Sequence, residues 1–572
     1  MRILFLISAY NGLSQRMHVE LLERGHEVSV ELSLSPDVMR EAIALYEPDL
    51  LLCPFLKDRI PEDIWSQHVC IVLHPGIKGD RGPSALDWAI LNGEQDWGVT
   101  ALQAVKEMDA GDIWSSRTFP MREATKASIY RHEVTEAAVE ALLEAVARCK
   151  QDDFAPEPLY YSKPDVRGEL RPYMRQHVRQ IDWTTEKTAE IVRKINMSDS
   201  SPGLLDEIGG MEVYLYGAHP EAKHLGEPGE VIARRHGAIC RATVDGAVWI
   251  SHLRRRNTDG QSFFKLPAAD VLGERLADVP EATIDVLYTG TEATFREIWY
   301  EERDQVGYLH FDFYNGAMST EQCRRLTEAY RAACERPTKV IVLLGGTDFW
   351  SNGIHLNTIE AADDPAEESW RNINAIDDLI EAILTTRTHQ TVAAVHGNAG
   401  AGGVIFALAA DHVWVREGVV LNPYYKTMGL YGSEYWTYLL PKRVGQEKAL
   451  ELTEACMPVG TAEAEHIGLV DEVISARFEA FEAEVARRAA ALAAADDFEE
   501  RMVAKLEAHD RDEREKPLAT YREEELARMW QNFFGDDSFY HEARSGFVHK
   551  VAPEETPARL SLHRYHTRRY VA

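Results

Sequence analysis

Residues 70–90 read CIVLHPGIKGDRGPSALDWAI, a short apolar run that stops at His74, Pro75 and Gly76. Apolar runs of this length, bounded by Pro and Gly, are typical of buried strands. In open α/β sheets, ligands bind in the crevice where the strands end. The stretch therefore predicts a buried strand that presents His74 at the ligand-binding edge of a sheet.

The sequence upstream of this stretch repeats the same pattern. Apolar runs at 3–7, 28–32 and 50–53 alternate with segments of helical spacing, and a Gly/Ser turn at 11–14 separates the first run from the first helix. Alternation of strands and helices is typical of a parallel sheet with helices on its faces. We expect a Rossmann-like α/β domain over residues 1–165.

The rest of the chain divides into further parts. Short strand-like runs at 212–216, 230–234, 238–244 and 247–251 predict a small β-barrel-like domain over residues 166–270. Residues 271–305 lack sustained periodicity and are expected to be a connector. The α/β alternation returns over residues 306–480, and residues 481–572 are expected to form a C-terminal helical region and tail.

Composition excludes several classes of protein. The 62 Lys and Arg residues against 93 Asp and Glu give a net charge of −31, which argues against a nucleic-acid binder or a membrane-surface protein. The seven cysteines are scattered without a CxxC pair, so neither a disulfide framework nor a metal site is predicted. No segment approaches the roughly 20 apolar residues of a membrane span. We expect a cytoplasmic protein.

One set of polar residues points to acyl chemistry. His74 ends its predicted strand, and Asp109 follows a later one within Met108-Asp109-Ala-Gly111. An imidazole with a carboxylate partner can move a proton during acyl transfer. A His before Pro is also compatible with a purely structural role. The turn that carries Ser8 and Ser14 either lines the same cleft at a helix N-terminus or is a simple turn.

The wider pattern HPG…RG…WAI…GVT…MDAG resembles the folate-dependent formyltransferases over about residues 1–165. The resemblance implies 10-formyl-tetrahydrofolate as the formyl donor and His74 and Asp109 as catalytic residues. The Asn that these enzymes carry two residues before the His is Val72 here, so the oxyanion is held differently or the acceptor is not the usual amine. The contacts to the bound donor that we expect are Ser8, Ser14, Gln15, Arg81 and Arg131.

The second part of the chain has a weaker resemblance. Residues 160–256, with Ile181-Asp-Trp183 and Pro228-Gly-Glu-Val231, resemble the C-terminal barrel of methionyl-tRNA formyltransferase. That barrel is basic in an enzyme that binds tRNA. The acidic balance of this chain therefore argues against a tRNA substrate.

Two Gly-rich turns mark a second candidate site. Residues 345–357 and 395–403 each follow a predicted strand, and the second opens a helix. Two such turns can each present a backbone N–H to one oxygen and form an oxyanion hole for a thioester, although plain turns would look alike. Together with residues 462–471, they resemble the enoyl-CoA hydratase/isomerase (crotonase) family over about 306–480.

This second resemblance implies a coenzyme A thioester as ligand. It assigns the amide donors to Ile354 and Gly402, flanked by Gly353 and Gly403. The two hydratase glutamate positions hold Ile405 and either Tyr424 or Tyr425. Ordinary addition of water to an enoyl thioester is therefore not expected.

Tyrosines take the place of these glutamates. Four of them, at 424, 425, 431 and 435, lie within twelve residues and surround Glu434. Buried tyrosines commonly fill cores, which is one interpretation. The other is that Tyr424 or Tyr425 acts with Glu434 to handle a proton in a dry pocket, where burial raises the pKa of a carboxyl group.

The fusion of the two halves resembles the HypX (HoxX) family of hydrogenase maturation proteins over nearly the whole chain. The resemblance implies transfer of the formyl group to coenzyme A, decarbonylation of formyl-CoA, and supply of CO to [NiFe]-hydrogenase, with its maturation proteins as partners. Three alternatives remain open. They are a hydrolase that releases formate, a formyltransferase for an amine, and a non-catalytic scaffold that binds folate or coenzyme A.

Overall fold

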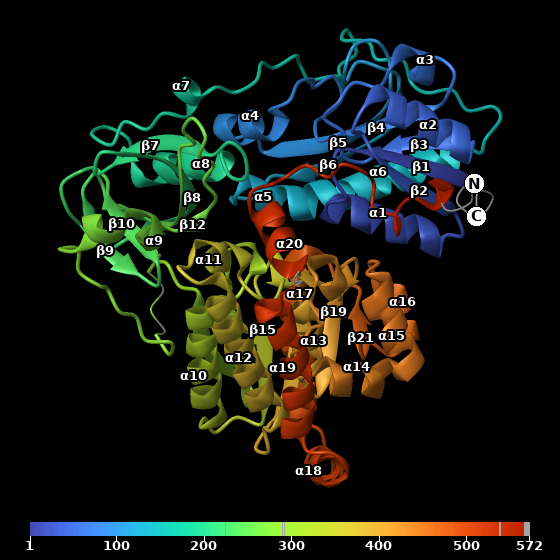
Figure 1. The fold of residues 1–572 in the computed structure, drawn as a ribbon. Coiled ribbons are helices and arrows are strands. Elements are labelled where there is room, and N and C mark those ends of the chain that lie inside the picture. Colours follow the sequence, from blue (N-terminus) through green and yellow to red (C-terminus); the bar gives the residue numbers. More distant parts are fainter. Residues whose placement is uncertain (224, 289, 291, 537–538, 565–572) are drawn as a thin grey trace. The chain divides into compact units, whose positions relative to one another are not determined.

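The chain packs into two compact units in a computed structural model that describes residues 1–223, 225–288, 290, 292–536 and 539–564 (Figure 1). Unit 1 comprises Met1–Arg256, Pro267–Val279 and the segment that begins at Ala552. Unit 2 comprises Asn257–Leu266 and Pro280–Val551. The five-part division expected from the sequence stays a prediction.

The first sheet of unit 1 has the strand order β2-β1-β3-β4-β5-β6, and its first four strands are parallel, as predicted. Strands β5 and β6 run antiparallel. Residues 104–112, which join them, are too few for the crossover of a dozen or more residues that a parallel pair needs. The strands are β1 (Arg2–Ile7), β2 (Glu27–Leu32), β3 (Leu50–Cys53), β4 (Cys70–His74), β5 (Asp96–Gln103) and β6 (Ile113–Pro120).

Helices cover this sheet and bury its apolar runs. The strand β1 is apolar on both faces, and Leu4 and Leu6 pack with Met39 and Ile43 of a helix. Side chains buried on both faces are typical of strands inside a doubly covered sheet. The helices are α1 (Gly12–Glu23), α2 (Pro36–Tyr46), α3 (Glu62–Trp65), α4 (Ala85–Asn92), α5 (Lys126–Ile129) and α6 (Thr135–Arg148). A further short helix, α7 (Gln176–Arg179), contacts the second sheet of this unit.

The second sheet of unit 1 is antiparallel, with the order β7-β8-β11-β10-β9 and β12 beside β11. Its core packs Leu215 and Ile250 against Ile191 and Ile195 of α8 (Thr188–Met197) and Leu272 of α9 (Ala268–Leu272). All four strand-like runs of the sequence lie mainly within its strands. These are β7 (Leu204–Ile208), β8 (Met211–Glu221), β9 (Val231–Arg235), β10 (Ala238–Ala242), β11 (Ala247–Arg255) and β12 (Leu266–Pro267).

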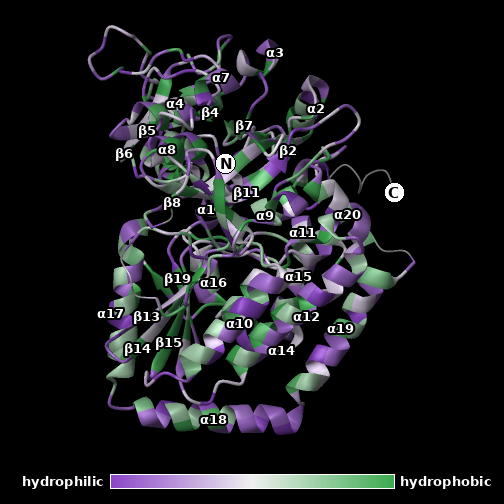
Figure 2. Ribbon diagram, turned by 90° about the vertical axis from the view of Figure 1, so that its left-hand side faces the viewer, coloured by the Kyte–Doolittle hydropathy of each residue, from purple (hydrophilic) through white to green (hydrophobic). Residues whose placement is uncertain are grey.

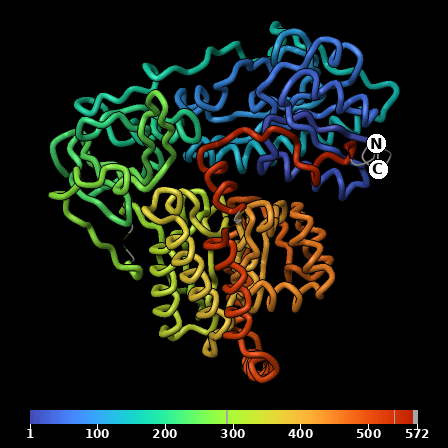
Figure 3. The backbone as a smooth tube through the Cα atoms, in the orientation of Figure 1, coloured from blue at the N-terminus to red at the C-terminus, as the bar shows by residue number. Residues whose placement is uncertain are grey.

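Residues 552–564 lie along the edge strand β2, where the sequence predicted a polar tail (Figure 3). Val30 N–H donates to the Leu560 carbonyl at 2.9 Å. Glu31, which is fully buried, accepts from the Arg564 guanidinium at 2.7 Å, and His563 Nε2 lies 2.8 Å from its carboxylate. An unpaired buried carboxylate is very unfavourable, so the segment supplies the partners that β2 lacks.

Unit 2 is built on a sheet of order β13-β14-β15-β17-β19-β21, parallel except for the β13-β14 pair. Alternate residues of β15 face opposite sides: Ile341 and Leu343 pack in the core with α10 and α12, whereas Val340 and Val342 pack against α17. Figure 2 shows these strands as hydrophobic and the helices as mixed. The strands are β13 (Ile298–Arg303), β14 (Val306–Phe311), β15 (Val340–Leu344), β17 (Gln390–Val395), β19 (His412–Arg416) and β21 (Glu472–Ile474).

A small parallel sheet, β16-β18-β20, lies in the same unit. Its strands are β16 (Phe349–Ser351), β18 (Asn398–Gly400) and β20 (Leu421–Asn422). The helices of unit 2 are α10 (Thr320–Cys334), α11 (Leu356–Ala361), α12 (Pro365–Leu384), α13 (Gly402–Leu408), α14 (Trp436–Val444), α15 (Gln446–Ala455), α16 (Thr461–His466), α17 (Phe481–Ala493), α18 (Phe498–Glu515), α19 (Leu518–Phe534) and α20 (Phe539–Val548). Within the described residues, no helix combines the length and apolarity needed to cross a membrane.

Candidate functional site

His74 lies at the carboxyl end of β4 with a carboxylate on either side of its ring. Its Nδ1 is 3.5 Å from Asp109 Oδ1, so the predicted pair is brought together. Its Nε2 is 2.8 Å from Asp80 Oδ2. The backbone of Asp109 adopts a left-handed conformation with φ 57°, and its carboxylate accepts from the Gly82 N–H at 3.4 Å. The fold therefore fixes both the imidazole and its carboxylate partner.

Asp80 is a site residue that the sequence analysis missed. Its side chain is fully buried, and Arg171 Nε lies 3.4 Å from its Oδ1. A Cβ on Gly76 would lie 2.5 Å from His74 Nε2, so only glycine leaves room for the ring. Burial alone lowers the pKa of His74, but the hydrogen bond to Asp80 and the charges of Asp109 and Asp80 raise it above its ordinary value. The imidazole is thus biased toward its protonated form.

A cavity of about 200 Å³ opens beside Asp109. Val72, which stands where formyltransferases carry Asn, lines it together with Leu102 at the end of β5. Its lining combines apolar side chains with charged ones such as Arg59 and Lys106, so it can hold a small organic molecule that has both an apolar ring and polar groups. The remaining lining residues are Leu56, Asp58, Arg59, Ile60, Glu62, Trp65, Gln103, Ala104, Val105, Lys106, Glu107, Met108 and Asp109.

The other predicted contacts of this site lie on several elements. Ser8 directly follows β1, at the same sheet edge as His74, and its hydroxyl accepts from Lys57 N–H at 2.9 Å. Ser14 is buried and donates to the Ala9 carbonyl, while Gln15 donates to the Tyr10 carbonyl. Arg81 does not line the cavity beside Asp109 and donates to the Met108 carbonyl at 3.2 Å. Arg131 lies in a π-helical turn, Tyr130–Val134.

In unit 2, the small sheet assembles the second candidate site. Its three strands are parallel, so their carboxyl ends meet at one edge. Strand β16 leads into Gly353 and Ile354, β18 into Gly402, and β20 into Tyr424 and Tyr425. Residues that are up to about 70 positions apart in the sequence are thus gathered by strands of only two or three residues.

The glycines show how closely these segments approach. A Cβ on Gly353 would lie 3.4 Å from the Gly402 nitrogen, and one on Gly403 would lie 2.0 Å from the Ser351 carbonyl oxygen. A Cβ on Gly400 would lie 3.0 Å from the Tyr424 hydroxyl. The two predicted amide donors are therefore on adjacent loops in van der Waals contact, and a side chain at Gly403 would collide with the Ser351 backbone.

The loop that carries Ile354 is fixed on both sides. Gly353 N–H donates to Ser351 Oγ at 3.1 Å, and His355 N–H donates to Asn372 Oδ1 at 3.0 Å. Gly402 is the first residue of α13, whose opening N–H groups have no partner within the helix. This arrangement suits two amides that point at one oxygen, with the positive end of the helix dipole beside them.

Glu434 lies against this pair of loops. A Cβ on Gly402 would be 2.0 Å from Glu434 Oε1, and Glu434 Oε2 accepts from the Tyr425 hydroxyl at 3.0 Å and from Ser433 N–H at 3.1 Å. Burial, reinforced by the charge of Asp377, raises the pKa of Glu434 to about 8. Near neutral pH this carboxyl group is mostly protonated, and Oε1 is the oxygen left to carry the proton.

The four tyrosines differ in burial, which bears on the two roles considered from the sequence, core packing and proton handling with Glu434. Tyr425 and Tyr435 are buried in the core, and Ile405 is fully buried there as well. Tyr424 and Tyr431 are half-buried. Tyr425 therefore both fills the core and contacts Glu434.

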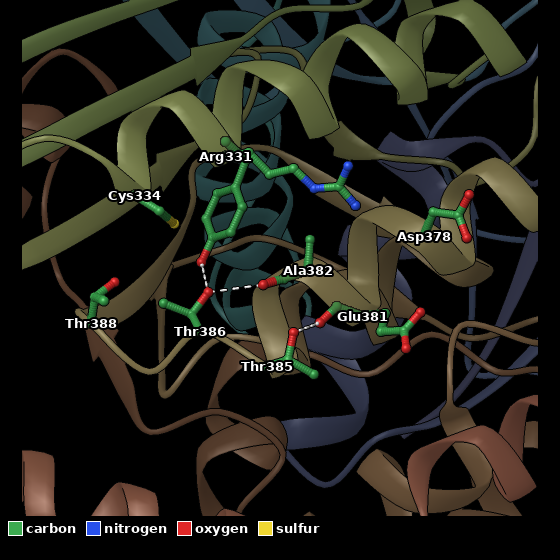
Figure 4. Close-up of a pocket in the computed structure, with 9 residues that line it drawn as sticks. Arg331, Cys334, Asp378, Glu381, Ala382, Thr385, Thr386 and Thr388 are labelled. Carbon is green, nitrogen blue, oxygen red and sulfur yellow. Dashed lines mark hydrogen bonds between the residues drawn. The ribbon is translucent and has the colours of Figure 1, made fainter.

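Another cavity in unit 2, of about 480 Å³, lies between α10 and α12 and is polar (Figure 4). The Thr386 hydroxyl there lies 2.6 Å from the Tyr330 hydroxyl and donates to the Ala382 carbonyl. None of the predicted site residues lines this cavity. We place no chemistry in it.

Three family descriptions match the chain. Formyl transferase matches residues 31–146, formyl transferase C-terminal domain matches 174–266, and enoyl-CoA hydratase/isomerase matches 304–555. The first sheet of unit 1 thus belongs to a formyltransferase domain, its second sheet to a formyltransferase C-terminal domain, and unit 2 has the crotonase fold, as predicted.

Several known proteins are similar to this chain. The hydrogenase maturation factor HoxX of Bradyrhizobium diazoefficiens is 51% identical over 99% of this chain and 97% of its own length. The crystal structure of HypX from Aquifex aeolicus in complex with tetrahydrofolic acid matches with a TM-score of 0.95 and 50% identity over 99% of both chains. Human mitochondrial 10-formyltetrahydrofolate dehydrogenase is 26% identical over 51% of this chain and 32% of its own. The chain belongs to the HypX/HoxX family of hydrogenase maturation factors.

Proposed function

We propose that this protein makes carbon monoxide from 10-formyl-tetrahydrofolate in two steps, formyl transfer to coenzyme A and decarbonylation of formyl-CoA, and supplies it to [NiFe]-hydrogenase maturation. The observation that carries the proposal is the buried Glu434 carboxyl, which accepts a hydrogen bond from Tyr425 and lies against Gly402 of a crotonase fold. The positions of both hydratase glutamates hold other residues, so this group serves a reaction other than hydration.

The first step belongs to the site in unit 1. The cavity beside Val72 and Asp109 suits a folate ring, in keeping with the complex that Aquifex aeolicus HypX forms with tetrahydrofolic acid. There the N10–formyl bond breaks, a sulfur–formyl bond forms, and the thiol proton ends on N10. His74, whose pKa is raised by Asp80 and Asp109, accepts the thiol proton and passes it to N10, and its charged form stabilises the charge on the formyl oxygen.

The second step belongs to the site in unit 2. The amides of Ile354 and Gly402 orient and polarise the formyl oxygen of the thioester. Glu434, assisted by Tyr425 or Tyr424, donates its proton to the sulfur as the carbon–sulfur bond breaks, and then accepts the formyl proton. The products are CO and coenzyme A, and Glu434 ends in its starting form.

The burial of this second site fits the same reaction. Tyr425 and Glu434 are 4% and 2% exposed. Water at this position would divert formyl-CoA to formate, so a dry pocket favours decarbonylation. The remaining crotonase-side contacts that we propose for coenzyme A are the backbone at Gly353 and Gly403.

A sealed-vial assay tests the proposal. Purified protein receives 10-formyl-tetrahydrofolate and coenzyme A, deoxyhaemoglobin reports CO by its spectrum, and formate is measured in parallel. We expect CO that depends on His74 and on Glu434. Formate without CO would instead establish the hydrolase alternative, formylation of an added amine would establish the amine transferase, and neither product would favour the scaffold.

The setting of the reaction is also part of the proposal. All seven cysteines are free, which suits the reducing cytoplasm where we expect the protein to work. We expect the CO to be received by [NiFe]-hydrogenase maturation proteins. CO transfer to such a protein, followed by the infrared band of its iron-bound CO, checks this expectation.

A further inference from the structure

The turn that carries Glu434 has an unusual backbone. Glu434 and Tyr435 both adopt left-handed conformations, with φ 61° and 60°. Residues with a Cβ rarely take this conformation, and two in succession are rarer still. The segment Ser433–Thr437 is therefore held in place by its surroundings. Two buried carboxylates from other helices make the contacts.

Asp377 of α12 holds the first half of the turn. Its side chain is fully buried, and its Oδ1 accepts from the Glu434 N–H at 2.9 Å. The Ser433 hydroxyl lies 3.0 Å and 2.9 Å from its two oxygens. Asp377 thus bonds the backbone of the very residue whose carboxyl group lies against Gly402.

Glu525 of α19 holds the second half. Its side chain is buried, and it accepts from Tyr435 N–H at 2.9 Å and from Thr437 N–H at 2.8 Å. These amides belong to the N-terminus of α14, which has no side-chain cap of its own. A carboxylate at a helix N-terminus satisfies unpaired N–H groups and interacts favourably with the helix dipole. Glu525 therefore caps α14 from a different helix.

We propose that Asp377 and Glu525 are positioning residues of the second site, which hold the Ser433–Thr437 turn and thereby keep the Glu434 carboxyl against Gly402. This inference rests on the proposed function of Glu434. The hydrogen bonds of both residues to this region end on the Ser433–Thr437 turn. They act through the backbone of the turn.

The charges around Glu434 give the positioning residues a second effect. Tyr425 donates a hydrogen bond to it, and the other titratable groups that interact with it electrostatically are Cys323 of α10, Asp377 of α12 and Glu525 of α19. Arg522 of α19, 3.9 Å from Asp377, also pairs with Asp378 and Glu381. Burial also raises the pKa of Asp377 to about 7 and that of Glu525 to about 8, so these acids and Glu434 titrate in the same range. Because Asp377 lies beside Arg522 and has the lowest pKa of the three, its negative charge opposes ionisation of Glu434.

Four substitutions distinguish the positioning of Glu434 by these residues from the effect of their charge on its pKa. Asp377→Asn removes the charge but keeps an acceptor, whereas Asp377→Ala and Glu525→Ala remove the hold on the turn. Asp378→Asn is the matched control, because Asp378 is the neighbouring residue on α12, is 56% exposed and pairs with the same Arg522. Its expected CO release is within twofold of the native rate.

Two readouts test the inference. The first is the kcat of CO release against pH. We expect the alanine variants to lose at least tenfold in kcat with KM little changed, and the asparagine variant to keep its rate at low pH while its alkaline limb moves to lower pH. If the two residues were purely structural, their variants would have a lower melting temperature, but the alkaline limb of the pH profile would not move.

The second readout is the pKa of Glu434, followed by the infrared carboxyl band that Glu434→Gln removes. It requires no turnover, so it decides the inference even if the native protein makes no CO. We expect the Asp377→Asn variant to show a lower Glu434 pKa than the native protein. Folded variants with native kcat and an unmoved Glu434 pKa would overturn the inference.

Discussion

Replacing Gly402 with alanine would place a methyl group 2.0 Å from Glu434 Oε1 and 2.5 Å from its Cδ. Ordinary contact between such atoms requires about 3.5–4.0 Å. The helix cannot retreat, because the next residue, Gly403, already lies against the Ser351 carbonyl. The Glu434 carboxyl must therefore move by more than about 1 Å from its position against Gly402.

The size of the effect follows from this displacement. A misplacement of about 1 Å at a reacting group lowers the rate roughly 10²-fold, which corresponds to about 2.7 kcal/mol of activation free energy. Overpacking of the core costs about 1–3 kcal/mol of folding free energy. The Gly402→Ala protein should fold, and formyl transfer in unit 1 should be unchanged.

The assay follows both steps in one mixture. Chromatography measures formyl-CoA, deoxyhaemoglobin measures CO, and urea unfolding measures stability. We expect formyl-CoA to accumulate while CO release falls about 10²-fold. Gly546→Ala is the control, because a Cβ there meets nothing nearer than 4.0 Å. CO release within threefold of the native rate in a folded Gly402→Ala protein would refute the assigned role of this contact.

Other predictions concern both units. Asp80→Asn should lower the pKa of His74, because one of the two carboxylates beside the imidazole is replaced by a neutral amide. An NMR titration of the imidazole measures this pKa, and an unchanged value would contradict the pairing of His74 with Asp80. CO release should fall as pH rises through about 8, where Glu434 ionises, and a flat profile to pH 9 would exclude it as the proton donor. Phe533→Ala should cost about 3–5 kcal/mol in urea unfolding, because the ring is 1% exposed. Burial raises the pKa of Glu31, but its hydrogen bonds lower that pKa below the ordinary value. The ionised Glu31 therefore contributes its full stabilisation of the fold above the ordinary pKa, and this contribution is lost as the pH falls through the pKa of Glu31 in the folded protein. Glu31→Gln should cost about 3–5 kcal/mol at neutral pH and weaken the acid dependence of unfolding.

Long apolar runs made the main sheets predictable. The two strands expected before the Gly-rich turns are present as β15 and β17, because both are continuous apolar segments with sharp boundaries. The β16-β18-β20 sheet was not predicted, since strands of two or three residues carry no periodicity. The residues it gathers came from the resemblance to crotonases, whereas their mutual contact with Glu434 came from the structure.

The buried acids were missed for a different reason. Acidic residues in amphipathic helices are usually solvated, so the residue type alone predicts that Asp377 and Glu525 lie at the surface. A signal was present nonetheless: Asp377 lies between Ile373, Ile376 and Ile380 in the apolar stripe of α12. An acid at a core position of a helix predicts a buried hydrogen-bonding role. Asp80 carried no such signal, because it lies in a charged loop.

The pairing of β2 with the segment after Ala552 has a consequence for synthesis of the chain. Glu31 and its partner Thr556 are 525 residues apart in sequence. At about 5–20 residues per second, a ribosome needs roughly 25–100 s to travel between them. During that interval β2 is an uncovered edge with an unpaired acid, which is the state in which sheet edges recruit other chains. Nascent chains of this protein should therefore depend on chaperones longer than its sheet topology alone would require.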